Sequence, residues 1–462
     1  MQEASVKFQY FAAFVVNLLT VSYGITLGWP SPNILLLISD ESPLPSGKIT
    51  LESASWIASL LGVGALFGNL FFGFIINKFG RKMPLLLLSI PTIISWLLIW
   101  FAQNIYYLHA ARTLIGVVGG GVFVIVPLFL SEIASDRVRG FLGSTFILSA
   151  NFGILLAFVI GNYCDFYTSP KVAIVLMIVY IVLFYFFPES PTFLAKQGNL
   201  LAAEDSIRFY RGIRENYEES ELLQLEMAKL KNSVGDTKSD QNHGNSFILS
   251  DLSENPARKA ITIGIVLVIL NQFSGFFAMT NYTGLIFKEA DSTLPPNISA
   301  IIVATVQIVG SYMASLFVDR AGRKFLFAVS AVGMAVGLVV LGVYMMLKSW
   351  QYHVESVNWI PIVAFSFVIF IASWGIASLP FLIIAEIMPE NVKDFGVTFC
   401  TALMCCFTFI IVKCLPLLSD VLGFHGTMFL FAAVCLCSEL YLHFNMPETK
   451  GKSYEQIMDS LQ

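Results

Sequence analysis

The sequence predicts an all-α membrane protein in which about twelve transmembrane helices form two pseudo-symmetric six-helix bundles. Charged residues make up 13% of the 462 residues, whereas a soluble domain carries about a quarter. Hydrophobic residues make up 56% and gather in long uncharged stretches. Charge motifs that follow helices of the first half recur in the second half. The net charge of −4 also argues against a nucleic-acid partner.

The apolar stretches are each long enough for a helix that crosses a bilayer, which needs roughly 20 residues. The first six lie near residues 10–29, 54–76, 84–103, 108–130, 141–161 and 171–187. The second six lie near residues 260–286, 298–318, 325–347, 360–384, 395–418 and 423–445. The predicted units are an N-terminal bundle, a linker, a C-terminal bundle and a tail, at residues 1–187, 188–258, 259–446 and 447–462.

The polar segment 188–258 is predicted to be an intracellular helical linker. Leu200 to Ile213 and Tyr217 to Lys231 have helical composition, and residues 236–246 have the Asp, Ser, Asn and Gly content that is typical of disorder. The segment is short and nearly lacks apolar residues for a core, which argues against a separate catalytic domain.

The distribution of basic residues predicts the orientation of the chain. Most of the 27 Lys and Arg residues lie on the side that holds the N-terminus, and the positive-inside rule makes this side cytoplasmic. Both termini are then cytoplasmic. The sequon Asn297-Ile298-Ser299 falls on the outer side, so we expect glycosylation of Asn297 and a plasma-membrane location.

Three pairs of matching motifs relate the two halves. In each half a basic cluster follows the second helix, an acid ends the fourth helix with a base seven residues later, and another acid follows the last helix. If the fourth helix continues, this spacing places Glu132 and Arg139 on one helix face. The alternative is that the charges merely anchor the topology. The predicted cytoplasmic network consists of Arg81, Lys82, Glu132, Arg139, Glu189, Arg323, Lys324, Glu386, Lys393 and Glu448.

The order of these motifs allows a family comparison. The chain carries Gly73 to Lys82, Ser131 to Ala134, Pro188-Glu189-Ser190-Pro191, Asp319 to Lys324 and Pro447 to Lys452. Together they resemble the motifs of the sugar porter family of the major facilitator superfamily, although Asn77 stands where an Asp is usual. The resemblance implies the major facilitator fold, transport by alternating access and a substrate site near the midplane between the halves. It also implies that the charged network closes the cytoplasmic side when the carrier faces outward.

The resemblance also suggests where a sugar binds. The family run Gln-Gln-x-Ser-Gly-x-Asn in the seventh helix is here Asn271 to Phe277, and the tyrosine pair that follows is Asn281-Tyr282, which we expect to gate the site. Amides pair with sugar hydroxyls and aromatic rings stack on sugar C–H faces. The predicted substrate contacts are Gln272, Asn271, Gln307, Phe277, Trp374 and Phe381.

The pocket departs from the family pattern at several positions. The sugar-binding Gln of the fifth helix aligns with Ile147, and Asn151 is a weaker polar candidate on that helix. A Glu of the tenth helix aligns with Trp374, and a Trp aligns with Phe381. The alternative is that the amides make interhelical hydrogen bonds and the aromatic rings pack the core. Similar departures occur in the branch that contains insect facilitated trehalose transporters.

The predicted function is therefore facilitative transport of trehalose or a hexose. Residues 10–29 contain no Asp or Glu near the midplane that a proton-coupled carrier would need. The alternatives are a proton-coupled symporter and a non-transporting sugar receptor of the same fold. No nucleotide-binding loop, metal cluster or disulfide framework is evident, so we expect no enzyme activity, no cofactor and no metal. The expected partners are a sugar and the lipid bilayer, and the sequence predicts no oligomeric state.

Overall fold

The computed structural model describes residues 6–135, 137–213, 223–228, 230, 255–389, 392–452 and 454–461, and these residues form helices and loops without a strand. The helices of the N-terminal half are α1 (Lys7–Gly28), α2 (Pro30–Leu37), α3 (Leu51–Phe79), α4 (Lys82–Trp100), α5 (Ile105–Ile133), α6 (Arg139–Tyr163) and α7 (Thr168–Phe184). Two short helices, α8 (Pro191–Lys196) and α9 (Leu200–Arg211), follow them.

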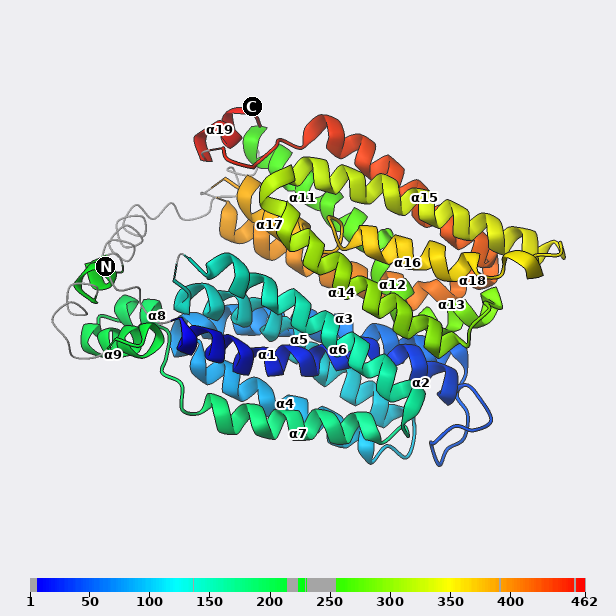
Figure 1. The fold of residues 1–462 in the computed structure, drawn as a ribbon, viewed down its shortest axis with the longest axis horizontal. Coiled ribbons are helices and arrows are strands. Elements are labelled where there is room, and N and C mark those ends of the chain that lie inside the picture. The colour runs from blue at the N-terminus through cyan, green and yellow to red at the C-terminus, as the bar shows by residue number, and fades with distance from the viewer. Residues whose placement is uncertain are drawn as a thin grey trace.

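The C-terminal half is built in the same way but has more interruptions. Its helices are α11 (Asn255–Phe273), α12 (Phe276–Asn281), α13 (Thr283–Ala290), α14 (Pro296–Ala321), α15 (Arg323–Ser349), the 3-10 turn η2 (Glu355–Val357), α16 (Ile360–Ala372), α17 (Pro380–Ile387), α18 (Lys393–Asn445) and α19 (Tyr454–Asp459). Figure 1 shows the two halves side by side, with α8, α9 and α19 at one end and α2 and α13 at the other. We call these the terminal end and the opposite end.

The described residues contain twelve membrane-spanning segments. Ten helical stretches are long and apolar enough to cross a bilayer, and α7 is a shorter apolar helix. One of the ten, α18, joins two helices across a kink at Gly423, where φ is 72°. The all-α fold with six spans in each half is therefore confirmed.

Two of the expected spans are not continuous helices. The span predicted near 260–286 is present, but its helix is interrupted at Gly275, whose φ of 85° is left-handed. The span predicted near 360–384 is also present, but α16 ends at Ala372 and α17 begins at Pro380. Proline lacks the N–H that a continuous helix needs and its ring clashes with the carbonyl four residues earlier.

The fourth span also ends too early to place Glu132 and Arg139 on one helix face. Helix α5 ends at Ile133 and α6 begins at Arg139, so Glu132 and Arg139 do not lie on one continuous helix. In the linker, α8 and α9 confirm helical structure up to Arg211, and residues 223–228 are helical. The expected disorder at 236–246 lies outside the described residues.

Glycines allow the closest helix contact of the N-terminal half, between α3 and α5. A Cβ atom on Gly64 would overlap the carbonyl oxygen of Thr113, and a Cβ on Gly116 would overlap that of Leu61. Small residues let backbones approach in membranes, where lipid gives helices no hydrophobic reason to associate. A Cβ on Gly119, Gly120 or Gly121 of α5 would meet similar overlaps, so these glycines also allow close packing.

This contact yields a direct stability prediction. Gly64→Ala is expected to destabilise the protein by about 1–3 kcal/mol, the usual cost of overpacking a tight contact. Gly73→Ala on the same helix is the matched control, because a Cβ at Gly73 meets no atom within 4 Å. Thermal unfolding in detergent should show a lower midpoint for the first variant alone. Equal midpoints for the two variants would show that widening the contact between α3 and α5 costs little free energy.

Candidate functional site

The break between α16 and α17 is held by an amide of the seventh span. A continuous helix would bond the N–H of residue 380 to the carbonyl of Ile376, but residue 380 is a proline. The freed carbonyl instead accepts a 2.6 Å hydrogen bond from Nδ2 of Asn271. Ser330 completes the support: its hydroxyl donates to the carbonyl of Ile371 at 2.7 Å and accepts from the N–H of Ile376 at 3.2 Å. Broken helices occur at membrane depth where such partners exist.

Gln272 continues this polar chain within the C-terminal half. Its Nε2 donates to Oδ1 of Asn271 at 2.6 Å, and its Oε1 accepts from the hydroxyl of Thr408 at 2.9 Å. Asn271 and Gln272 are 0% and 1% exposed. In this conformation both amides make hydrogen bonds to other spans, which was the alternative to substrate binding in the sequence analysis. Their contact with a substrate stays a prediction.

Gln307 lies in a second polar group, which joins the two halves. Its Nε2 donates to Oδ1 of Asn151 at 3.0 Å, and Nδ2 of Asn151 donates to the hydroxyl of Ser311 at 2.7 Å. Asn151 is on α6, whereas Gln307 and Ser311 are on α14. All three side chains are buried.

Two of the predicted aromatic contacts, Trp374 and Phe381, lie around the break in the tenth span. Trp374 packs against Phe317 and Phe370, and its indole N–H is buried without a partner among the described residues. Phe381 stacks on Phe123 of α5, in the other half, with ring centroids 6.2 Å apart. Both rings of that pair are more than one-third exposed although they touch across the two halves. Both rings therefore remain accessible at the contact between the halves.

The two expected gating residues and Phe277 lie on the segment after Gly275. The hydroxyl of Tyr282 donates to the carbonyl of Val412 at 3.2 Å, which ties this segment to α18. The amide of Asn281 donates to the carbonyl of Phe277 at 2.8 Å, within the same segment. Phe277 is partly buried against the core of the C-terminal half. A gating role for Asn281 and Tyr282 stays a prediction.

The two halves are also joined toward the opposite end. The backbone N–H of Gly284 donates to the hydroxyl of Ser31 at 3.0 Å. Lys413 of α18 places Nζ 4.2 Å from the ring centroid of Trp56 on α3 and donates to the hydroxyl of Ser55 at 2.8 Å. A Cβ on Gly62 would lie 2.9 Å from the backbone nitrogen of Phe409, so α3 and α18 approach closely there as well.

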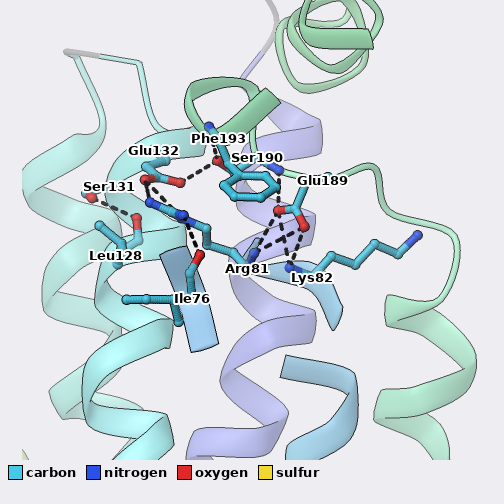
Figure 2. Close-up of polar contacts among 9 residues, drawn as sticks. All are labelled: Ile76, Arg81, Lys82, Leu128, Ser131, Glu132, Glu189, Ser190 and Phe193. Carbon is cyan, nitrogen blue, oxygen red and sulfur yellow. Dashed lines mark hydrogen bonds and ion pairs between the residues drawn. The ribbon is translucent and has the colours of Figure 1, made fainter. Parts of the chain in front are cut away.

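At the terminal end, a buried ion pair holds the N-terminal half together (Figure 2). Arg81 donates from Nη2 and Nε to Oε1 of Glu132 at 2.7 and 3.1 Å, and from Nη1 to the carbonyl of Ile76 at 3.0 Å. The two charged side chains are 6% and 8% exposed. Ser190 donates to the other oxygen of Glu132.

Glu189 binds the N-terminus of α4. Its carboxylate accepts from the backbone N–H groups of Arg81 and Lys82 at 3.0–3.2 Å. A carboxylate at this position is favoured by the helix dipole. The side chain of Lys82 extends away from Glu189 in Figure 2 and lies over the ring of Tyr185, with Nζ 5.7 Å from the centroid.

The C-terminal half repeats this arrangement more loosely. Arg323 pairs with Glu386 at 3.4 Å, and Glu448 accepts from the backbone N–H groups of Arg323 and Lys324 at 3.0 and 3.1 Å. Burial alone would raise the pKa of Glu448, but backbone donors, including that of Lys450, hold its pKa below the usual value. A depressed carboxylate pKa stabilises the fold above the unfolded-state pKa, and this contribution is lost as pH falls through the folded-state pKa.

The remaining predicted residues lie in the first turns of helices. Arg139 and Lys393 are exposed and begin α6 and α18, so their place in the network stays a prediction. Asn297 is in the first turn of α14, is partly buried, and has its Oδ1 buried without a partner among the described residues. Glycosylation of Asn297 likewise stays a prediction.

Comparison with known proteins identifies the family. The family model described as "Sugar (and other) transporter" matches residues 37–461. The chain belongs to this sugar transporter family. It is 31% identical over 449 residues to a facilitated trehalose transporter Tret1 of Bombyx mori, covering 97% of this chain and 86% of that protein. A Drosophila mojavensis protein of the same name is also 31% identical, but the chain spans 51% of its length.

A solved transporter structure has the same fold as this chain. The inward-open xylose transporter XylE from E. coli superposes with a TM-score of 0.77 at 19% identity, covering 98% of this chain and 99% of that one. The major facilitator fold expected from the motifs is therefore confirmed. The sugar transporters found by these comparisons are not enzymes, in agreement with the sequence.

Arg112 has a structural role that the motifs alone did not predict. This residue of α5 is 1% exposed and donates from Nη1 to the carbonyl of Thr26 at 2.7 Å and from Nε to that of Ile57 at 2.9 Å. It joins α1, α3 and α5. A lone arginine in an apolar span is a recognisable signal, because a buried charge needs partners, but its acceptors are backbone carbonyls that no motif reveals.

Proposed function

We propose that the chain is a facilitative sugar carrier that moves trehalose or a hexose by alternating access. It lies in the plasma membrane, and both of its termini are on the cytoplasmic side. The observation that carries the proposal is the pair of broken spans, which the hydrogen bond from Asn271 to the carbonyl of Ile376 joins inside the membrane-spanning bundle. Secondary transporters commonly build substrate sites at such breaks. Relatives described as facilitated trehalose transporters support the choice of substrate.

The environment of Arg112 supports uniport rather than proton symport. A proton-coupled carrier needs a titratable group near the membrane midplane. Helix α1 contains no Asp or Glu, and the buried guanidinium of Arg112 is held by the carbonyls of Thr26 and Ile57. Backbone carbonyls therefore stabilise this charge. It needs no carboxylate that could bind and release a proton as the sugar crosses the membrane.

Uptake in oocytes tests the proposal. We expect surface-expressed protein to raise uptake of radiolabelled trehalose or glucose, and a protonophore at a fixed sugar gradient to change the initial rate by less than about twofold, which corresponds to about 0.4 kcal/mol. Collapse of uptake with the protonophore would establish symport instead. Surface expression without uptake of either sugar would remove both assignments.

A further inference from the structure

The three side chains that join α6 to α14 have unused hydrogen-bonding capacity. An amide offers two N–H groups and a carbonyl with two lone pairs. Asn151 uses one N–H, toward Ser311, and one lone pair, toward Gln307. Oε1 of Gln307 accepts no bond from the described residues and is not among the polar atoms sealed from solvent. The group is therefore only partly satisfied although it is buried in a membrane-spanning interface.

Apolar contacts close one side of this group. Toward the opposite end, Ile154 and Phe158 of α6 pack against Ala300 and Ala304 of α14 in one buried cluster. This cluster packs the two halves together between Asn151 and the opposite end.

The other side of the group is more accessible. Ile147 lies one helical turn from Asn151 toward the terminal end, and residues four apart share a helix face. Ile147 is 38% exposed, whereas Asn151 is 7% exposed. The accessibility of side chains therefore increases from Asn151 toward the terminal end. Phe123 and Phe381, which touch across the two halves, are exposed as well.

We propose that Asn151 and Ser311 are substrate contacts that, together with Gln307, bind hydroxyl groups of the sugar between these accessible side chains and the apolar cluster. A hydroxyl both donates and accepts, so it matches the spare N–H of Asn151 and the free carbonyl oxygen of Gln307. The hydrogen bonds between the halves hold these groups in place when no sugar is bound. The inference rests on the proposed function and names the groups of α6 and α14 that select the sugar.

The test compares the transported sugar with its monodeoxy analogues. A site built around a hydroxyl discriminates strongly against the analogue that lacks it, because a buried polar group is left unpaired. In wild-type protein one analogue should show kcat/KM lower by at least about tenfold. Asn151→Leu should raise KM for the full sugar and reduce this discrimination to about twofold or less. Ser311→Ala, which removes a hydroxyl without adding volume, should reduce discrimination in the same direction.

Asn17→Leu is the matched control. Asn17 is also a buried amide, but its Nδ2 donates to the hydroxyl of Thr145 within the same half at 2.9 Å. This variant should keep the wild-type discrimination pattern. If wild type discriminates but both Asn151→Leu and Ser311→Ala retain the full pattern, the assignment is wrong while the proposed function stands. If wild type moves no sugar, the proposed function fails and this inference fails with it.

Discussion

Glu132→Gln is expected to lower the thermal unfolding midpoint by several degrees, and more than Glu386→Gln does. Breaking a buried ion pair leaves the partner charge uncompensated and costs about 3–5 kcal/mol. Arg81 and Glu132 are 6% and 8% exposed and 2.7 Å apart. The equivalent pair of the C-terminal half is 18% and 25% exposed and 3.4 Å apart, so water screens the remaining charge better. The two variants make the same chemical change at matching positions.

Midpoints of purified protein in detergent would measure this difference. The double variant Arg81→Met with Glu132→Gln serves as the control, since removing both charges should recover part of the loss. Equal losses for Glu132→Gln and Glu386→Gln would contradict the asymmetry between the two halves. A network that merely anchors topology would leave both midpoints near that of wild type.

Lys413→Met is expected to shift the carrier toward a conformation that is open at the opposite end. The ammonium of Lys413 joins α18 to α3 through the ring of Trp56 and the hydroxyl of Ser55. A desolvated cation–π contact contributes up to about 2 kcal/mol. Loss of about 1.4 kcal/mol would shift the equilibrium between the two conformations about tenfold.

Cys405 can report this shift, because its carbonyl lies 3.0 Å from the position that a Cβ on Gly62 would take, at the contact between the halves. The other six cysteines are replaced by serine in every variant, so that only Cys405 can react. An impermeant maleimide that reaches the protein from the opposite end should then label Cys405 faster in Lys413→Met than in the protein that keeps Lys413. Lys413→Arg keeps the positive charge, so its labelling should be as slow as with Lys413. Lys348→Met is the control, because Lys348 contacts Glu289 within its own half. An unchanged labelling rate in Lys413→Met would exclude this contact as a lock.

The sequence predicted the architecture because its signals are strong and local. Apolar length and charged helix ends located the spans, and the recurrence of Glu132 and Glu386 related the halves. The breaks at Gly275 and Pro380 carry signals of their own, but apolar runs on both sides obscured them. The hydrogen bond from Asn271 to the carbonyl of Ile376 could not be predicted, because it depends on how two spans that are distant in the sequence pack together.

The candidate site was harder to predict for the same reason. Composition marks Asn151 and Gln307 as costly amides in lipid. It does not show that they meet each other across the two halves, since this needs the position of α14 against α6. The contact of Ser311 with Asn151 is likewise tertiary, because an isolated hydroxyl in an apolar helix usually bonds its own backbone.

Flux through purified protein in lipid vesicles tests the central claim most directly. Vesicles preloaded with unlabelled trehalose or glucose should accumulate the labelled sugar transiently, by exchange, and this uptake should saturate with concentration. A receptor of the same fold would bind the sugar with no net or exchange flux. Saturable exchange in protein-containing vesicles, absent from empty ones, is the predicted result; binding without flux would contradict the carrier assignment.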